Sequence, residues 1–269
     1  QLFRAHTTAM SEPLYIFLTL AAFLSFWHYF SLEDQSTSTA KSAKNAKEKK
    51  LSALRVLSGS NGLLLITAIL TAFTYLTRYA GLALLATFLV SLFILHPTWK
   101  KRLTSTSIFL AGFIPFALAW SIRNRLLADN ATNRTLVYHP ITAENIQLGI
   151  TNFAAFFLPV EAWRRELIRI PNLFEVILTV IVLALLLWVV FKGLKKFFNP
   201  ATETPEILPF IGTLYFFGYL ASILSSMTLF DASTKFQLRI VAPMYVSLLI
   251  MLVYLGCWLW QKGATSLRI

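Results

Sequence analysis

A few charged side chains stand at the ends of long apolar stretches, where the chain would enter or leave a membrane. Arg78 is the one charged residue in the apolar stretch 63–95, and Arg239 immediately precedes another such stretch. Arginine at the depth of lipid headgroups suits a phosphate, because its planar guanidinium donates charge-assisted hydrogen bonds in matching geometry. We therefore predict a binding site for a lipid-linked phosphate or diphosphate, formed by Arg78, Arg239, Arg123 and Arg125.

Other polar and aromatic residues fall at the same predicted side of the membrane. Glu12, which precedes the first apolar stretch, is one of two acids in this set. The further candidates for lining a substrate cleft are His6, Tyr79, Asn124, His139, Asp231 and Lys235. Each has a plainer interpretation. Arginine at a helix end commonly extends its charge to the headgroups, and tyrosine commonly belongs to the interfacial belt.

The composition indicates a polytopic membrane protein. Hydrophobic residues make up 57% of the chain, aromatic residues 14%, and the mean hydropathy is +0.64. We interpret the formal net charge of +12 as a signal of membrane topology, because the basic residues lie beside apolar runs. We exclude nucleic acid as a partner on that ground, and expect membrane lipids instead.

The apolar runs predict an all-α fold, a bundle of about seven transmembrane helices. A helix that spans the hydrocarbon core needs roughly 20 apolar residues. Residues 63–95 as one helix would be about 50 Å long, too long for a bilayer, so we predict a reversal at residues 77–81. Arg78 then lies at a membrane face. The predicted spans are 14–30, 63–76, 80–95, 108–122, 173–191, 207–227 and 240–260.

The distribution of Lys and Arg predicts the orientation. Residues 31–62, 96–107 and 192–206 and the C-terminal tail share one side, which carries more of the 24 basic residues and nearly all the lysines. The positive-inside rule makes this side cytoplasmic. The N-terminal residues, Arg78, the loop 123–172 and the loop 228–239 are then extracytoplasmic, and we predict a multi-pass protein of the cell (inner) membrane.

We treat residues 1–269 as a single transmembrane domain with two distinctive loops. Residues 31–61 form a lysine-rich cytoplasmic loop. In the extracytoplasmic loop 123–172, apolar residues recur at helical spacing in 146–157 and again in 163–170, which predicts two amphipathic helices lying in the membrane interface.

The sequence assigns no cofactor. The four histidines show no metal-ligand spacing, so a divalent metal has no visible ligand set. His28 and His96 fall on the predicted cytoplasmic side and are interpreted as interfacial residues. The single cysteine, Cys257, excludes an internal disulfide.

Four stretches, in order along the chain, resemble the GT-C membrane glycosyltransferases, the group of the protein O-mannosyltransferases and lipid A aminoarabinose transferases. They are AHTTAMSEPLYIFLTLAAF, GLLLITAILTAFTYLTRYAGLALL, WSIRNRLLADNATNR and FQLRIVAPMYVSLL. The resemblance implies transfer of a sugar from a polyprenyl-phosphate donor to an acceptor at the extracytoplasmic face. It also implies that Arg78 holds the carrier phosphate and that Glu12 supports catalysis at the active-site wall.

The family's catalytic aspartate lies in a first outer loop, after a first span, and neither has a counterpart in these residues. We therefore expect this sequence to be the C-terminal part of a longer chain and to be inactive by itself, because a hydroxyl acceptor needs a general base within hydrogen-bond reach. Other functions that the residues leave open are a transporter or flippase-like carrier of an anionic or lipid-linked substrate, a non-catalytic assembly subunit, and a ligase or polymerase of surface polysaccharides. The identity of the sugar and of the acceptor, and the oligomeric state, are not determined by the sequence.

Overall fold

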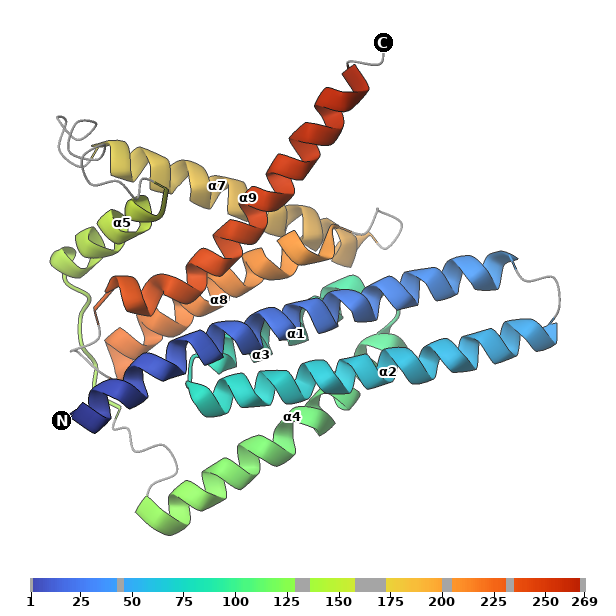
Figure 1. The fold of residues 1–269 in the computed structure, drawn as a ribbon, viewed down its shortest axis with the longest axis horizontal. Helices are drawn as coiled ribbons and strands as arrows, with labels where there is room; N and C mark the ends of the chain where they lie inside the picture. The colour runs from blue at the N-terminus through green and yellow to red at the C-terminus, as the bar shows by residue number, and fades with distance from the viewer. Residues whose placement is uncertain are drawn as a thin grey trace. The chain divides into compact units, whose positions relative to one another are not determined.

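A computed structural model of the chain describes residues 2–42, 46–128, 136–157, 173–199, 205–230 and 235–266. Within these ranges the regular structure is entirely helical, which confirms the all-α prediction (Figure 1). The helices are α1 (Leu2–Ser42), α2 (Ala46–Thr77), α3 (Gly81–Leu95), α4 (Trp99–Ala128), α5 (Ala143–Phe157), α7 (Leu173–Phe198), α8 (Ile207–Leu229) and α9 (Leu238–Ser266).

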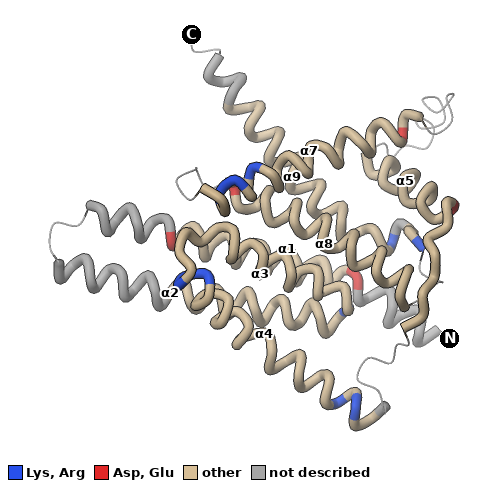
Figure 2. Tube along the Cα trace, turned by 180° about the vertical axis from the view of Figure 1, so that it is seen from behind, with Lys and Arg blue, Asp and Glu red and all other residues tan. Residues whose placement is uncertain are grey.

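Six of these helices are long and apolar enough to cross a bilayer, so by the length and composition of its helices the chain is a multi-pass membrane protein. The apolar segments are Glu12–Glu33, Gly59–Thr77, Trp99–Leu127, Leu173–Phe198, Ile207–Leu229 and Arg239–Gln261. Figure 2 shows the described charged residues near the ends of the described helical segments, with uncharged residues between them. This arrangement keeps charge out of the hydrocarbon layer, where each ion costs several kcal/mol (roughly 2.5–3.5 on insertion scales).

The remaining predicted span is α3, which is apolar but has only 15 residues. Its length of about 22 Å falls short of the hydrocarbon thickness. Most of its side chains are buried, including Leu84, Phe88 and Leu92 at 0% exposure, so α3 is a packed inner helix of the bundle.

The predicted reversal at residues 77–81 is confirmed. The amide of Arg78 donates to the Thr74 carbonyl over 2.9 Å, and the amide of Gly81 donates to the Arg78 carbonyl over 2.9 Å. A β-carbon on Gly81 would lie 2.4 Å from the backbone nitrogen of Tyr75, so α3 starts at a distance from α2 that only glycine allows.

The prediction of a loop at residues 31–61 is wrong in its secondary structure. Helix α1 continues to Ser42 and α2 begins at Ala46, so the backbone is helical on both sides of residues 43–45. Alanine, lysine and glutamate dominate residues 40–50 within this stretch, and all three have high helix propensity. The position of the stretch on the cytoplasmic side stays a prediction.

The chain divides into two compact units. Unit 1 comprises Gln1–Asn133 and Lys196–Ile211, and unit 2 comprises Arg134–Lys195 and Gly212–Ile269. The prediction of one transmembrane domain concerns the whole chain and stays a prediction.

The core of unit 1 is aromatic and lies between α1, α3 and α4. Phe26 of α1 packs on Phe88 of α3 with ring centroids 4.5 Å apart, and Phe88 lies 5.9 Å from Phe109 of α4. Helices α2 and α4 pack closely through small residues, since a β-carbon on Gly112 would lie 2.8 Å from that of Ala68.

In unit 2, α5 packs on α9. The ring of Phe156 stacks on that of Tyr245 at 4.6 Å, and the Tyr245 hydroxyl donates to the Asn152 carbonyl over 2.6 Å. The helix predicted over 146–157 is therefore confirmed as a helix, although its placement in the membrane interface stays a prediction. The second predicted helix, 163–170, lies outside the described residues.

Candidate functional site

Arg78 and Glu12 lie together at one end of unit 1. Nη1 of Arg78 is 3.5 Å from Oε1 of Glu12, and the side chains are 23% and 18% exposed. The guanidinium also lies over the Tyr15 ring, 5.9 Å from its centroid. Arginine has five N–H donors, so a guanidinium held in this way can still donate to an external phosphate.

Tyr79 and the basic residues at the end of α4 belong to the same end of unit 1. Ala68 of α2 lies beside Gly112 of α4, and Phe73 farther along α2 packs on Phe116 farther along α4, so the two helices run in the same direction and end on the same side. The last turns of α4 carry Arg123, Asn124 and Arg125. The Arg123 guanidinium lies 5.1 Å from the Trp120 ring centroid, an arrangement typical of an arginine near the headgroup layer.

Three other predicted residues share one end of unit 2. The amide of His139 donates to the Thr228 carbonyl over 2.7 Å, near the end of α8. Lys235 is exposed and precedes α9, and Arg239 lies in the first turn of α9. Asp231 and the side chain of His6 lie outside the described residues.

Unit 2 also contains a buried acid that sequence reasoning missed. Glu175, in the first turn of α7, is 4% exposed and accepts a hydrogen bond of 2.9 Å from the Thr151 hydroxyl. A carboxylate in the first turn is favoured by the helix dipole. The signal in the sequence was a single acid at the start of a long apolar run.

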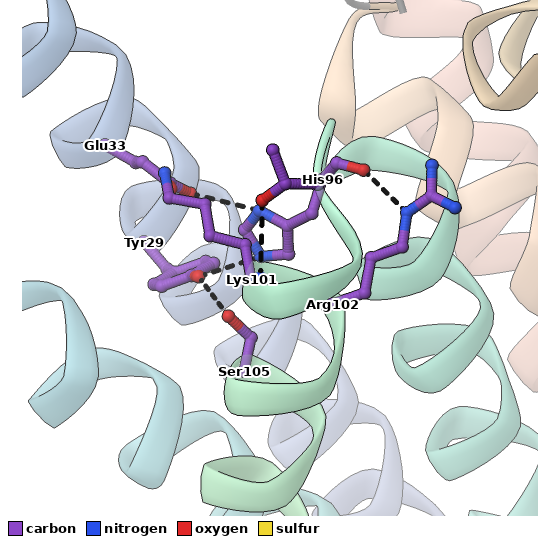
Figure 3. Close-up of polar contacts among 7 residues, drawn as sticks. Tyr29, Glu33, His96, Lys101, Arg102 and Ser105 are labelled. Carbon is purple, nitrogen blue, oxygen red and sulfur yellow. Dashed lines mark hydrogen bonds and ion pairs between the residues drawn. The ribbon is translucent and has the colours of Figure 1, made fainter.

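The most connected polar cluster lies at the other end of unit 1, where the sequence predicted only interfacial residues. Figure 3 shows that its members come from α1, α4 and the segment between α3 and α4. The Tyr29 hydroxyl is 3.0 Å from Nε2 of His96 and 3.1 Å from the Ser105 hydroxyl. Nδ1 of His96 is 3.6 Å from the Glu33 carboxylate.

Two cations complete this cluster. Lys101 forms an ion pair with Glu33, and Nε of Arg102 donates to the His96 carbonyl over 2.8 Å. The Arg102 guanidinium is buried over the rings of Trp99 and Phe197, at 5.1 and 4.6 Å from their centroids. Arg102 therefore has a structural role, because it fixes the segment that carries His96.

His96 is 1% exposed, so its side chain is buried within unit 1, and its position at the membrane interface stays a prediction. Burial lowers the pKa of His96 below its ordinary value of 6.5, Lys101 and Arg102 lower it further, and the Glu33 carboxylate opposes this shift. The imidazole is consequently neutral at pH 7, with one ring nitrogen as donor and the other as acceptor.

Each unit also contains a pocket. The pocket in unit 1 has a volume of about 320 Å³ and is lined by residues at the His96 end, among them Trp27, Glu33, His96, Lys101 and Glu206. The pocket in unit 2 has a volume of about 190 Å³ and an almost wholly apolar lining from α5, α7, α8, α9 and the residue Phe236. Among the described residues no group of three or more His, Cys, Asp or Glu side chains is placed to hold a metal.

The fold and the distribution of charge define a helical, multi-pass membrane protein. Comparison with protein-family models, with characterised proteins and with solved structures finds no match to this chain. The inference of a function therefore depends on the arrangement of its own side chains.

Proposed function

We propose that this chain belongs to a membrane glycosyltransferase, which transfers a sugar from a polyprenyl-phosphate donor to an acceptor at the extracytoplasmic face of the cell (inner) membrane. The observation that supports this most directly is the pair of Arg78 and Glu12 at the ends of two apolar segments. A cation at that depth meets the phosphate of a lipid-linked donor, while the prenyl chain stays in the hydrocarbon layer.

In this proposal Arg78 binds the donor phosphate, and Glu12 orients the guanidinium. The ion pair keeps the charge at one position, and the partial exposure of both side chains leaves the guanidinium accessible. As the sugar leaves, negative charge grows on the phosphate, and a cation placed there in advance stabilises that charge. Arg123 and Arg125, at the same end of unit 1, add positive potential that attracts the donor.

The test compares Arg78→Ala with Arg78→Lys in membranes of cells that express the protein from its complete native gene. The measurement is the formation of a new glycosidic bond from a radiolabelled polyprenyl-phosphate sugar. We expect Arg78→Ala to lower kcat/KM by about ten- to hundredfold, the value of a lost charge-assisted hydrogen bond, and Arg78→Lys to lower it less. Lys100→Ala is the control, since Lys100 is exposed in the first turn of α4, at the opposite end of unit 1.

The result also separates a transferase from a carrier. A carrier moves the labelled donor across the vesicle membrane and leaves its sugar–phosphate bond intact. Movement of the label without a new glycosidic bond, or full transfer activity in both Arg78 variants, would contradict the proposal.

A further inference from the structure

The pocket in unit 1 lies where several predicted spans end. Its lining comes from the last turns of the α1 span, which ends at Glu33, from the segment between α3 and α4, and from the residues that begin α8. In a chain whose apolar helices cross a bilayer, helix ends lie at the depth of the lipid headgroups. Trp27, half-exposed in this lining, is a residue type concentrated at that depth. The pocket is therefore within reach of a phospholipid headgroup.

The lining carries both signs of charge. Lys101 contributes an ammonium group whose side chain is 45% exposed, and Glu33 and Glu206 contribute carboxylates. His96 is neutral at pH 7 for the reasons given above. The pocket is therefore more acidic than basic, although one cation is available in it.

The two acids differ in what they contact. Glu33 is paired with Lys101 and His96 (Figure 3). Glu206 is exposed at the pocket, and within the described part of the chain no ion pair to it is present. Glu206 lines the same pocket as the indole of Trp27. A primary ammonium group can donate to a carboxylate and also bind against an aromatic ring, so this lining suits it.

Lys101 has donors for a second partner. An ammonium group carries three N–H donors, and the ion pair with Glu33 engages only one side of the group. A phosphate oxygen placed at the opposite side of Nζ would accept a charge-assisted hydrogen bond. The cation for a phosphate and the acid for an ammonium group are then in one pocket, whose volume of about 320 Å³ is that of a small-ligand site.

We propose that this pocket binds the phosphoethanolamine headgroup of a phospholipid, with the ammonium group at Glu206 and Trp27 and the phosphate at Lys101. An anionic headgroup such as phosphatidylglycerol can place its phosphate at Lys101, but it has no ammonium group to offset the Glu206 carboxylate. A choline headgroup has no N–H to donate to the Glu206 carboxylate. The proposal is independent of the glycosyltransferase activity, since it concerns the opposite end of unit 1.

The experiment measures lipid binding to the purified protein in detergent by native mass spectrometry. Dioleoyl phosphatidylethanolamine, phosphatidylcholine and phosphatidylglycerol are added separately at matched concentrations. We expect phosphatidylethanolamine to bind at least about tenfold more tightly than the other two, the effect of one additional charge-assisted hydrogen bond. Free O-phosphoethanolamine is added as a competitor, and we expect it to displace the lipid poorly because it lacks the acyl chains.

Two variants and a matched control assign the binding to this pocket. Glu206→Gln should reduce binding of phosphatidylethanolamine to the level of phosphatidylcholine, and Lys101→Gln should weaken binding of both lipids. Lys100→Gln removes a neighbouring exposed cation that does not line the pocket and should leave binding unchanged. Lys101 also pairs with Glu33, so its substitution removes a contact within the fold. If Lys101→Gln fails to fold for this reason, Glu206→Gln is the deciding variant, because Glu206 is exposed.

Three results would overturn the proposal. Equal binding of the three lipids would show no headgroup recognition, and unchanged selectivity in Glu206→Gln would place the recognition elsewhere. Displacement by free O-phosphoethanolamine at concentrations equal to those of the lipid would assign the site to a soluble phosphoethanolamine ligand instead of a phospholipid.

Discussion

The guanidinium of Arg78 and the carboxylate of Glu12 lie 3.5 Å apart, although 66 positions separate them in the chain. The pair joins the end of α2 to the beginning of the α1 span. It answers why a stretch as apolar as 63–95 contains a guanidinium: the residue is at a helix end, beside an acid and an aromatic ring. Because the pair brings the end of the α2 span beside the beginning of the α1 span, the two spans run antiparallel.

We expect a small but measurable energetic coupling between these two residues. A double-mutant cycle with Arg78→Gln and Glu12→Gln, followed by thermal unfolding in detergent, should give a coupling of about 0.5–1 kcal/mol, as for other partly exposed ion pairs. The same cycle with Lys100→Gln in place of Arg78→Gln is the control and should give a coupling near zero. A coupling near zero for Arg78 and Glu12 would show that the contact contributes nothing to folding.

A labelling experiment tests the predicted topology. The chain has one cysteine, Cys257, so Cys257→Ser gives a background for single cysteines at Ala80, Lys235 and Lys100. In intact cells we expect an impermeant maleimide to label Ala80→Cys and Lys235→Cys, and to label Lys100→Cys only after permeabilisation. If Ala80→Cys and Lys235→Cys were labelled from opposite sides, Arg78 and Arg239 could not belong to one donor site.

His96 should make the protein less stable in mild acid. The folded-state pKa is lowered, so below the unfolded value of 6.5 the unfolded chain binds a proton that the folded chain does not. The contribution of His96 to the free energy of unfolding is fully present above pH 6.5 and decreases as the pH falls. At one pH unit below that value the loss is up to about 1.4 kcal/mol. The measurement is the thermal midpoint of purified protein between pH 7.5 and 5.5.

The variant His96→Gln should remove most of this dependence. His28→Gln is the matched control, because His28 is exposed on the same helix as Tyr29 and Glu33. The same loss of stability in acid for wild type and His96→Gln would assign the effect to other groups.

Gly81 should tolerate no side chain, whereas Gly62 should accept one. Alanine at position 81 would place its β-carbon 2.4 Å from the backbone nitrogen of Tyr75, and we expect Gly81→Ala to lower the free energy of unfolding by about 1–3 kcal/mol. At Gly62, nothing lies within 4 Å of an added β-carbon. Gly62→Ala should stabilise α2 by about 0.5–1 kcal/mol, because alanine loses less backbone entropy in a helix. The measurement is chemical or thermal unfolding of both variants, and equal effects would contradict the role of Gly81 in the reversal.

The sequence predicted the helices well, because hydrophobicity is a property of each segment by itself. Every predicted span lies inside a helix of the structure, apart from one residue at the turn before α3. The reversal near Arg78 followed from length alone, since a helix as long as 63–95 does not fit a bilayer. The boundaries of α1 and α2 were not predicted, because the lysine-rich stretch was assigned from its charge and low complexity although its residues favour helix.

The sequence by itself determined that this is an all-helical, multi-pass membrane protein, and it predicted that Arg78 lies at a membrane face. Only the tertiary structure decided which side chains meet: that Glu12 faces Arg78, that His96 is buried against Tyr29, and that Glu206 shares a pocket with Lys101. The physical reason is that charge and hydropathy depend on each residue, whereas these contacts depend on the rotation and axial position of each helix. Those are set by packing, as in the fit of Phe26 on Phe88 and of Gly112 on Ala68.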